Sequence, residues 1–315
     1  MILLTKTSFA VVGTGIVGER IIKQLLANDS AEIVALFDEN KKRLAEMADT
    51  YGLHAASSYE EVLSLKPNWV YIGTPPVSHA PLGEMAIHAG LDVLCEKPLA
   101  HDACDGLVMA QVAEKSHGQT AMHFPLMYSP AARHMMELVE KGTVGDVVRV
   151  ELSTYFPHWP RHWQQNPWIG SREQGGFTRE VFPHYFQIMY RMFGNISIHE
   201  HKTTYPDDQL LAETSVLAMG QTENQIPVLL NGLSGIGQEE ELSYTVYGTE
   251  GVLKLRNWSE LSVAQKDSPF EILTSFDSVK TLVEECISAA KGEEALLVSF
   301  AEGLVVQRLI DELLK

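Results

Sequence analysis

Residues 8–27 of the chain read SFAVVGTGIVGERIIKQLLA. Residues 8–13 form a short apolar run that ends in glycine, which is typical of a buried strand. Residues 16–27 repeat apolar side chains at helical spacing, with Ile16, Ile21 and Leu25 on one face. Between them, GTGIVG matches G-x-G-x-x-G, whose glycines permit a tight turn and a close approach of backbone to phosphate. The stretch therefore predicts a strand, a glycine-rich turn and a helix in direct succession.

The context of this turn predicts a dinucleotide site. A second apolar run, residues 32–38, ends at Asp38, which lies 20 residues beyond Gly18. A pyrophosphate would bind at the helix N-terminus, where free N–H groups and the positive end of the helix dipole face it. Asp38 would accept hydrogen bonds from a ribose 2′-hydroxyl and repel a 2′-phosphate, which favours NAD. The basic run 41–43 follows closely and could bind a 2′-phosphate, so NADP is the alternative. The cofactor-binding residues predicted in this segment are Gly13, Thr14, Gly15, Ile16, Val17, Gly18 and Asp38.

Strands and helices continue to alternate up to residue 124. Apolar runs predict further strands over residues 68–74 and 92–97, and helices are expected over residues 16–27, 41–51, 79–88 and 103–116, with another starting after residue 58. Strands joined by such helices lie parallel with right-handed crossovers, so we predict a doubly wound α/β (Rossmann) domain over residues 1–124. Ligands bind at the carboxyl ends of such strands. The residues expected to contact the cofactor there are Thr74, Pro75, His79, Glu96 and Lys97.

The pattern changes after Phe124. Residues 130–141 predict a helix, residues 146–156 predict a long alternating strand, and several more alternating stretches follow up to residue 264. Period-two alternation with short turns is typical of antiparallel strands with one exposed face. Helices are expected again over residues 276–291 and 300–314. We therefore predict a second domain, of the α+β class, over residues 125–315.

Composition narrows the class of partner. The 315 residues include 41 Asp and Glu against 24 Lys and Arg, a formal net charge of −17. Binding to nucleic acid or to an anionic membrane depends on clustered Lys and Arg, so we expect neither partner. The first residues predict a short tail before the first strand and no signal peptide. Three cysteines, an odd and small number, argue against a disulfide framework and favour a cytoplasmic location.

Several motifs together resemble the glucose–fructose oxidoreductase and inositol dehydrogenase (Gfo/Idh/MocA) family. They are GTGIVG, then TPPVSH at 74–79 and AGLDVLCEKPLA at 89–100, followed by VEKGTVGDVVRVE at 139–151 and REQGGFTREVFPHYF at 172–186. The resemblance implies a Rossmann domain followed by a domain with a large, open, mostly antiparallel sheet. It also implies that homodimers or homotetramers form through the exposed face of that sheet. The implied activity is NAD(P)-dependent hydride transfer at a hydroxyl or carbonyl carbon of a sugar, cyclitol or related polyol.

The resemblance also implies roles for three residues. Lys97 matches the lysine that contacts substrate oxygen and the nicotinamide ribose, and His184 matches the histidine assigned to proton transfer. Glu180 stands where the family most often has aspartate. Two positions depart from the family pattern. Gln187 replaces a frequent aspartate, and residues 124–128 (FPLMY) lack a frequent Asn-Arg pair.

The residues around His184 support this interpretation independently. Residues 177–193 have helical periodicity, with Pro183 tolerable only in a first turn. Glu180 and His184 are four residues apart, so the carboxylate could orient the ring while the histidine accepts a hydroxyl proton. Lys97 would stabilise the developing alkoxide. The alternative is an amphipathic helix whose polar stripe faces solvent.

Residues 155–168, YFPHWPRHWQQNPW, contain five aromatic side chains. They could form a pocket wall or lid, because aromatic faces pack against apolar faces of a ligand. They could equally form a loop packed on the second domain or a subunit contact. The histidines at 158, 162, 199 and 201 have no fixed mutual geometry, so no metal is expected.

We therefore predict an NAD-dependent oxidoreductase that acts on a small, carbohydrate-like molecule. One alternative is an NADPH-dependent reductase of a ketone, imine or conjugated double bond. The other is a non-catalytic protein that senses a dinucleotide or binds a partner on the same fold. Retention of Lys97 and His184 argues against the last of these.

Overall fold

A computed structural model describes residues 6–164 and 166–315. The tail predicted at the N-terminus falls mostly on residues 1–5, outside the described residues, as does Gln165 of the aromatic segment. The chain forms two compact units. The first consists of the chain up to His123 together with Lys280–Gln307, and the second of Phe124–Val279 with Arg308–Lys315. The expected division placed every residue after 124 in the second domain, whereas the chain returns to the first unit over Lys280–Gln307.

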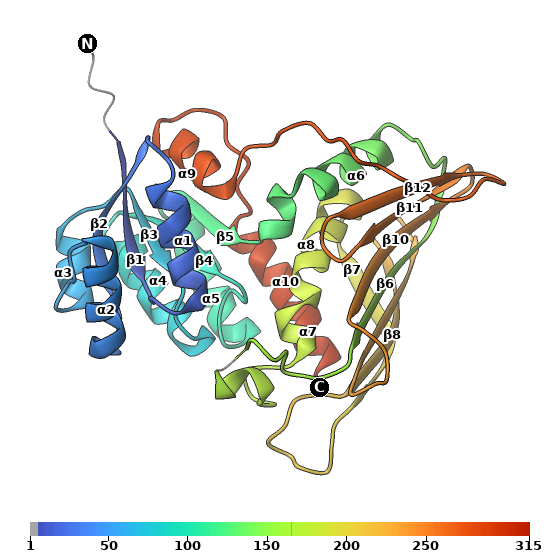
Figure 1. The fold of residues 1–315 in the computed structure, drawn as a ribbon, viewed down its shortest axis with the longest axis horizontal. Helices are drawn as coiled ribbons and strands as arrows, with labels where there is room; N and C mark the ends of the chain where they lie inside the picture. The colour runs from blue at the N-terminus through green and yellow to red at the C-terminus, as the bar shows by residue number, and fades with distance from the viewer. Residues whose placement is uncertain (1–5, 165) are drawn as a thin grey trace. The chain divides into compact units, whose positions relative to one another are not determined.

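The first unit contains a five-stranded parallel sheet in the order β2-β1-β3-β4-β5 (Figure 1). Its strands are β1 (Thr7–Val12), β2 (Ala31–Phe37), β3 (Trp69–Ile72), β4 (Asp92–Glu96) and β5 (Thr120–His123). Its helices are α1 (Ile16–Leu26), α2 (Lys41–Tyr51), α3 (Tyr59–Ser64), α4 (His79–His88), α5 (Ala103–Glu114), α9 (Leu282–Ala290) and α10 (Phe300–Leu313) as far as Gln307, with a 3₁₀ turn η1 (Pro76–Ser78). The predicted doubly wound parallel sheet is confirmed. Its strand order reverses between β1 and β3, which is where such sheets open a ligand crevice.

The return segment is anchored to the first unit by specific hydrogen bonds. The indole of Trp69 donates to the carbonyl oxygen of Cys286 at 2.9 Å, and the N–H of Met122 donates to Val298 at 2.8 Å. The helix predicted over residues 276–291 begins only at Leu282. Thr281 and Glu284 form a capping box there, because each side chain accepts a hydrogen bond from the backbone N–H of the other residue. The stronger start signal thus lies inside the predicted helix.

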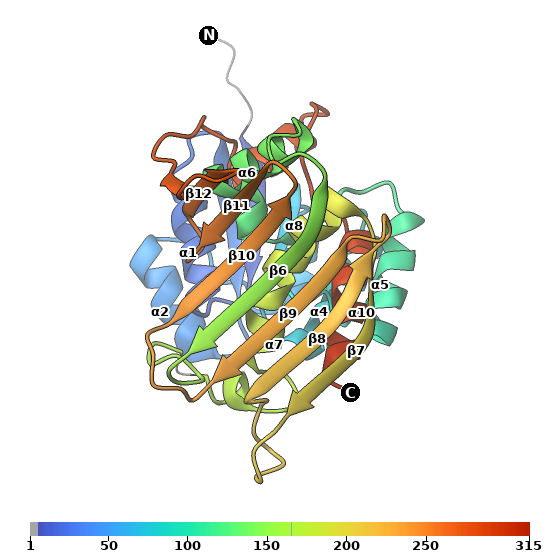
Figure 2. The same cartoon turned by 90° about the vertical axis from the view of Figure 1, so that its right-hand side faces the viewer.

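The second unit contains an eight-stranded sheet in the order β13-β12-β11-β10-β6-β9-β8-β7, seen face-on in Figure 2. Every neighbouring pair is antiparallel except β6 and β9. The predicted mostly antiparallel sheet is therefore confirmed. Its strands are β6 (Val147–Phe156), β7 (Ile196–Thr204), β8 (Ser215–Thr222), β9 (Pro227–Ser234), β10 (Glu241–Gly248), β11 (Gly251–Arg256), β12 (Glu260–Gln265) and β13 (Glu271–Ile272). Its helices are α6 (Pro130–Glu140), α7 (Phe177–Glu180) and α8 (Phe182–Phe193), with 3₁₀ turns η2 (Pro125–Tyr128) and η3 (Pro167–Gly170).

The two faces of this sheet differ in burial. Strand β8 alternates buried and exposed positions, as a strand with one solvated face does. On the covered face, Gly232 leaves room for the rings of Phe177 and Phe182, since a Cβ at Gly232 would lie 2.4 Å from the Phe177 ring. The opposite face carries half-exposed apolar side chains, among them Leu217 and Met219. In the described part of the chain, no helix is both long and apolar enough to cross a membrane.

Candidate functional site

The glycine-rich turn lies at the point where the strand order reverses. Gly13 follows β1 with φ +91°, and a Cβ there would lie 2.6 Å from the carbonyl carbon of Gly73, directly after β3. At Gly18 a Cβ would lie 2.0 Å from the carbonyl oxygen of Gly13, so this glycine permits helix α1 to pack on the turn. Gly15 differs, because no atom lies within 4 Å of the Cβ position. Gly13 and Gly18 thus permit close backbone contacts that the fold requires, whereas Gly15 leaves open space at the N-terminus of α1.

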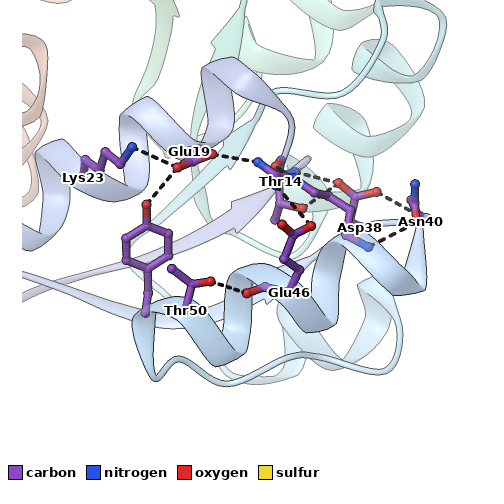
Figure 3. A network of polar contacts seen from close by, with 9 residues as sticks. Thr14, Glu19, Lys23, Asp38, Asn40, Glu46 and Thr50 are labelled. Atoms are coloured by element: carbon purple, nitrogen blue, oxygen red, sulfur yellow. Dashed lines mark hydrogen bonds and ion pairs between the residues drawn. The ribbon is translucent and has the colours of Figure 1, made fainter.

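Asp38 connects the end of β2 to this turn (Figure 3). Its Oδ2 accepts hydrogen bonds from the N–H and the hydroxyl of Thr14, at 2.7 and 2.9 Å. Its Oδ1 accepts from the N–H of Asn40 at 2.8 Å. The carboxylate predicted to bind a ribose thus also fixes the conformation of the glycine-rich turn.

The other predicted cofactor residues lie at the ends of β3 and β4. The buried ring of His79 bridges them, with Nδ1 2.8 Å from the carbonyl oxygen of Pro98 and Nε2 2.8 Å from that of Thr74. Burial lowers the pKa of His79, and a neutral ring can donate to only one of these two carbonyls at a time. His79 therefore holds together the segments that carry Thr74 and Lys97.

Glu96 belongs to a buried cluster that the sequence analysis did not identify. Its Oε1 accepts hydrogen bonds from the hydroxyl of Tyr71 at 2.9 Å and from Nδ1 of His123. Burial by itself raises the pKa of Glu96, but the His123 ring and Lys97 outweigh it and the pKa lies below its ordinary value. The cluster spans three neighbouring strand ends, because Glu96 pairs with His123 in register across β4 and β5. The signal available in the sequence was a histidine closing a short apolar run, residues 120–123.

In the second unit, the helix predicted over residues 177–193 is two helices. Helix α7 ends at Glu180, Val181 lies between the two helices with φ −115°, and α8 begins at Phe182. Pro183 has no N–H and would crowd the preceding turn, so a continuous helix is excluded and proline occupies the first turn of α8. The expectation of a single helix over residues 177–193 was therefore wrong.

His184 is buried, which excludes the alternative of a polar stripe facing solvent at this position. Gln187, one turn further on, is fully buried as well. Two aromatic rings meet the His184 ring edge-on. The centroid of Phe124 lies 6.1 Å away and that of Trp258 5.4 Å away, with interplanar angles of 84° and 80°.

Trp258, like Tyr71 and His123, is a residue that the sequence analysis did not identify. It lies in the turn between β11 and β12, where Asn257 and Trp258 have φ of +45° and +74°. Positive φ is uncommon for residues other than glycine, and it is especially uncommon for bulky ones. The indole also stacks on Tyr185, with centroids 5.4 Å apart and planes inclined by 24°. No motif predicts this contact, because the turn lies more than seventy residues beyond His184 in the sequence.

Glu213 supports the segment that leads into α7. Its Oε1 accepts a hydrogen bond from the N–H of Thr178 at 2.7 Å, and burial raises the pKa of this carboxyl. Gly176 has φ +98°, and a Cβ there would lie 2.2 Å from Oε2 of Glu213. The second glycine of the GGFTRE sequence is therefore required by a buried carboxyl side chain.

The aromatic segment packs on its own unit. Arg161 lies over the rings of Phe156 and Trp159, at 5.1 and 5.4 Å, and makes a bidentate ion pair with Glu240. The indole of Trp159 donates to the carbonyl oxygen of Ile169 at 3.2 Å. These contacts bear out the packed-loop interpretation for this part of the segment. The rings of His158 and His162 are 4.8 Å apart, but the described residues include no group of three or more potential ligands placed to hold a metal ion.

The comparisons with known proteins identify the class. Residues 7–124 match the oxidoreductase family with the NAD-binding Rossmann fold (GFO/IDH/MocA), and residues 132–254 match the GFO/IDH/MocA C-terminal domain. The chain belongs to this oxidoreductase family, as the sequence motifs predicted.

Among curated relatives, oxidoreductase P35 of Formosa agariphila is 22% identical over 61% of this chain and 62% of its own length. Inositol 2-dehydrogenase of Rhizobium meliloti is 22% identical over 81% of this chain and 77% of its own length.

Among solved structures, an oxidoreductase from Thermotoga maritima has a TM-score of 0.84 at 21% identity, covering 98% of this chain and 96% of its own. A 3-ketoreductase from Actinomadura kijaniata, in complex with NADP and TDP-benzene, has a TM-score of 0.83 at 18% identity, covering 98% and 97%. At these identities the likeness establishes the fold.

Proposed function

We propose that this protein is an NAD-dependent dehydrogenase that transfers hydride at a hydroxyl or carbonyl carbon of a sugar, cyclitol or related polyol. The observation that carries the proposal is the glycine-rich turn. Gly13 and Gly18 are closed against backbone, while Gly15 leaves open space at the N-terminus of α1. That is the distribution of space a pyrophosphate needs. The relatives named as sugar or cyclitol dehydrogenases support the choice of substrate class.

The residues present fit this cofactor. The pyrophosphate would bind to the glycine-rich turn, which consists of Gly13, Thr14, Gly15, Ile16, Val17 and Gly18. The adenosine ribose would bind to Asp38. The ends of β3 and β4 would border the bound molecule through Thr74, Pro75, Glu96 and Lys97. His79 would act by holding those ends in place. The nicotinamide, when bound, supplies the hydride acceptor.

The chemistry would be shared between two side chains. His184 of the second unit would accept the hydroxyl proton as the carbinol carbon is oxidised. Lys97 of the first unit would stabilise the negative charge that develops on the substrate oxygen. Glu180 would assist from the end of α7, close in sequence to His184 on a separate helix. Burial of His184 between aromatic rings supports this role, because it keeps bulk water away from the ring.

The second candidate is an NADPH-dependent reductase of a ketone, imine or conjugated double bond. It is favoured by the basic run at residues 41–43 and by the structural neighbour that binds NADP.

We further propose a homodimer or homotetramer built on the exposed sheet face around Leu217 and Met219. The three free cysteines support a cytoplasmic location.

The test begins with titration of NAD and NADP by isothermal calorimetry, followed by a panel of polyols and ketones with each cofactor. Lys97→Ala and His184→Gln are expected to lower kcat by about 10²–10⁴-fold, and His184→Gln should leave cofactor affinity nearly unchanged. Lys115→Ala and His117→Gln, at exposed positions before β5, are the matched controls. Absence of binding by both cofactors overturns the proposal, and binding without turnover across the panel favours a non-catalytic protein.

A further inference from the structure

Arg43 lies close to the predicted ribose site, and its guanidinium already contacts oxygen atoms of the protein. It lies in the first turn of α2, where its N–H donates to the capping side chain of Asn40 at 3.1 Å. Its Nε donates to the carbonyl oxygen of Thr14 at 2.9 Å. Its Nη2 donates to Oε2 of Glu19 at 2.7 Å, and Nη1 lies 3.4 Å from Glu46. Every nitrogen of the guanidinium therefore faces an oxygen of the first unit.

Glu19 is the centre of this network (Figure 3). Besides Arg43, it accepts hydrogen bonds from the hydroxyl of Tyr51 at 2.9 Å and from Lys23 at 2.8 Å. Hydrogen bonds from Lys23, Tyr51 and Arg43 lower the pKa of Glu19 to about 2. Its side chain is 26% exposed, against 59% for Glu46. Glu19 is thus a permanently charged and well-held partner for Arg43 at neutral pH.

Thr14 links this network to the predicted specificity residue. Asp38 accepts hydrogen bonds from the N–H and hydroxyl of Thr14, while Arg43 donates to its carbonyl oxygen. An arginine near the end of the second strand is the group that binds the 2′-phosphate of NADP in Rossmann domains. Here that arginine occupies the expected neighbourhood but is held on the glycine-rich turn by a carboxylate from α1.

We propose that Glu19 is a specificity-determining residue for the cofactor, because it holds the Arg43 guanidinium on the glycine-rich turn and withholds it from an adenosine 2′-phosphate. The inference rests on the proposed dinucleotide function and assigns part of the NAD preference to a residue outside the fingerprint. Lys41 is engaged in a similar way. Its Nζ lies 4.8 Å from the centre of the Phe37 ring and 3.2 Å from the carbonyl oxygen of Ser57. Neither cation is therefore placed for a 2′-phosphate without rearrangement.

The experiment compares NAD and NADP affinities of the wild type and Glu19→Gln by isothermal calorimetry. Glutamine keeps the shape and the oxygen that accepts from Tyr51 but removes the charge that holds Arg43. NADP affinity is expected to rise about three- to tenfold, the scale of one charge-assisted hydrogen bond, with NAD affinity changed less than about twofold. Glu19→Asp, which retracts the carboxylate, is expected to shift affinity in the same direction and serves if the glutamine variant folds poorly.

Two controls separate this inference from general electrostatics. Glu46→Gln makes the same charge change beside Arg43 but leaves the 2.7 Å hydrogen bond from Arg43 to Glu19 in place. The NADP affinity of this variant should therefore stay near that of the wild type. The double variant Glu19→Gln/Arg43→Gln should lose the gain. Three outcomes overturn the inference while NAD binding stays intact. They are an equal gain in NADP affinity in Glu46→Gln, a gain in NADP affinity that survives loss of Arg43, and unchanged NADP affinity in both Glu19 variants. A wild type that binds neither nucleotide overturns the proposed function as well.

Discussion

The indole of Trp258 meets the imidazole of His184 edge-on, with centroids 5.4 Å apart and planes at 80°. The same indole stacks on Tyr185, the next residue of α8. A turn between two strands thus fixes the orientation of the histidine proposed to transfer a proton. Edge-to-face and stacked aromatic pairs contribute roughly 0.5–1.5 kcal/mol each beyond burial.

Substitution of Trp258 should therefore separate ring orientation from cofactor binding. Trp258→Ala removes both aromatic contacts, and we expect kcat to fall about tenfold or more while the Kd for NAD is unchanged. Trp258→Phe keeps an aromatic ring and should retain most of the activity. Steady-state kinetics with calorimetric NAD titration checks this, and equal loss in both variants would contradict an orienting role.

The glycine-rich turn offers a contrast between folding and binding. Gly18→Ala places a Cβ against the Gly13 carbonyl oxygen, so the turn must shift, and we expect a loss of about 1–3 kcal/mol in the free energy of unfolding. Gly15→Ala meets no atom within 4 Å and should fold normally. It should nevertheless bind NAD at least about tenfold more weakly, because the methyl group enters the space proposed for the pyrophosphate. Thermal melting and NAD titration of both variants test the contrast, which fails if Gly15→Ala binds NAD normally.

The pH dependence of stability should report the Glu96–His123 pair. The pKa of Glu96 is lower in the folded state than its ordinary value of 4.5, so the folded state binds fewer protons than the unfolded state in the acid range. This contribution to stability is complete above the unfolded pKa and is lost as pH falls through the folded pKa. Wild-type stability should therefore rise with pH through this range.

His123→Gln should reverse that slope. Without the ring, burial is the largest remaining influence on the pKa of Glu96 and it raises that pKa. We therefore expect stability to fall as pH rises toward neutrality. Breaking a buried pair in this way costs about 3–5 kcal/mol at neutral pH. Urea unfolding of wild type and His123→Gln between about pH 2 and pH 8, which spans the acid range and neutrality, measures both slopes. Parallel curves would show that the two groups are not coupled.

Glu213 should act on the second unit alone. Glu213→Ala leaves the Thr178 N–H at the start of α7 without its buried acceptor, at a cost of about 1–3 kcal/mol. Glu213→Gln keeps a side-chain oxygen for this hydrogen bond and should cost less. We expect turnover to fall more in the alanine variant, with NAD affinity unchanged in both. A change in NAD affinity would show that Glu213 has effects beyond its own unit.

The first unit shows how much of this protein follows from local pattern. Strand, glycine-rich turn, helix and Asp38 occur within a short stretch, and the close contact of Gly18 is with the backbone of Gly13 in that same stretch. The close contact of Gly13 is with Gly73, which the pairing of β1 with β3 brings to it. Apolar periodicity and Gly or Pro signals likewise place most helices within a few residues of their observed bounds. The exceptions are instructive. Pro183 divides a periodic segment into two helices, and the capping box at Thr281 delays a helix that periodicity would start earlier.

The surroundings of the proposed functional groups required the tertiary structure. Trp258 reaches His184 from a distant turn, His123 and Tyr71 reach Glu96 from neighbouring strands, and Glu19 reaches Arg43 from another helix. Periodicity reports which face of an element is buried, but it carries no information about which side chain from elsewhere will meet that face. The sequence motifs therefore predict the class of protein, because these motifs act through local backbone geometry. The partners that tune its charged and aromatic groups are set by long-range packing.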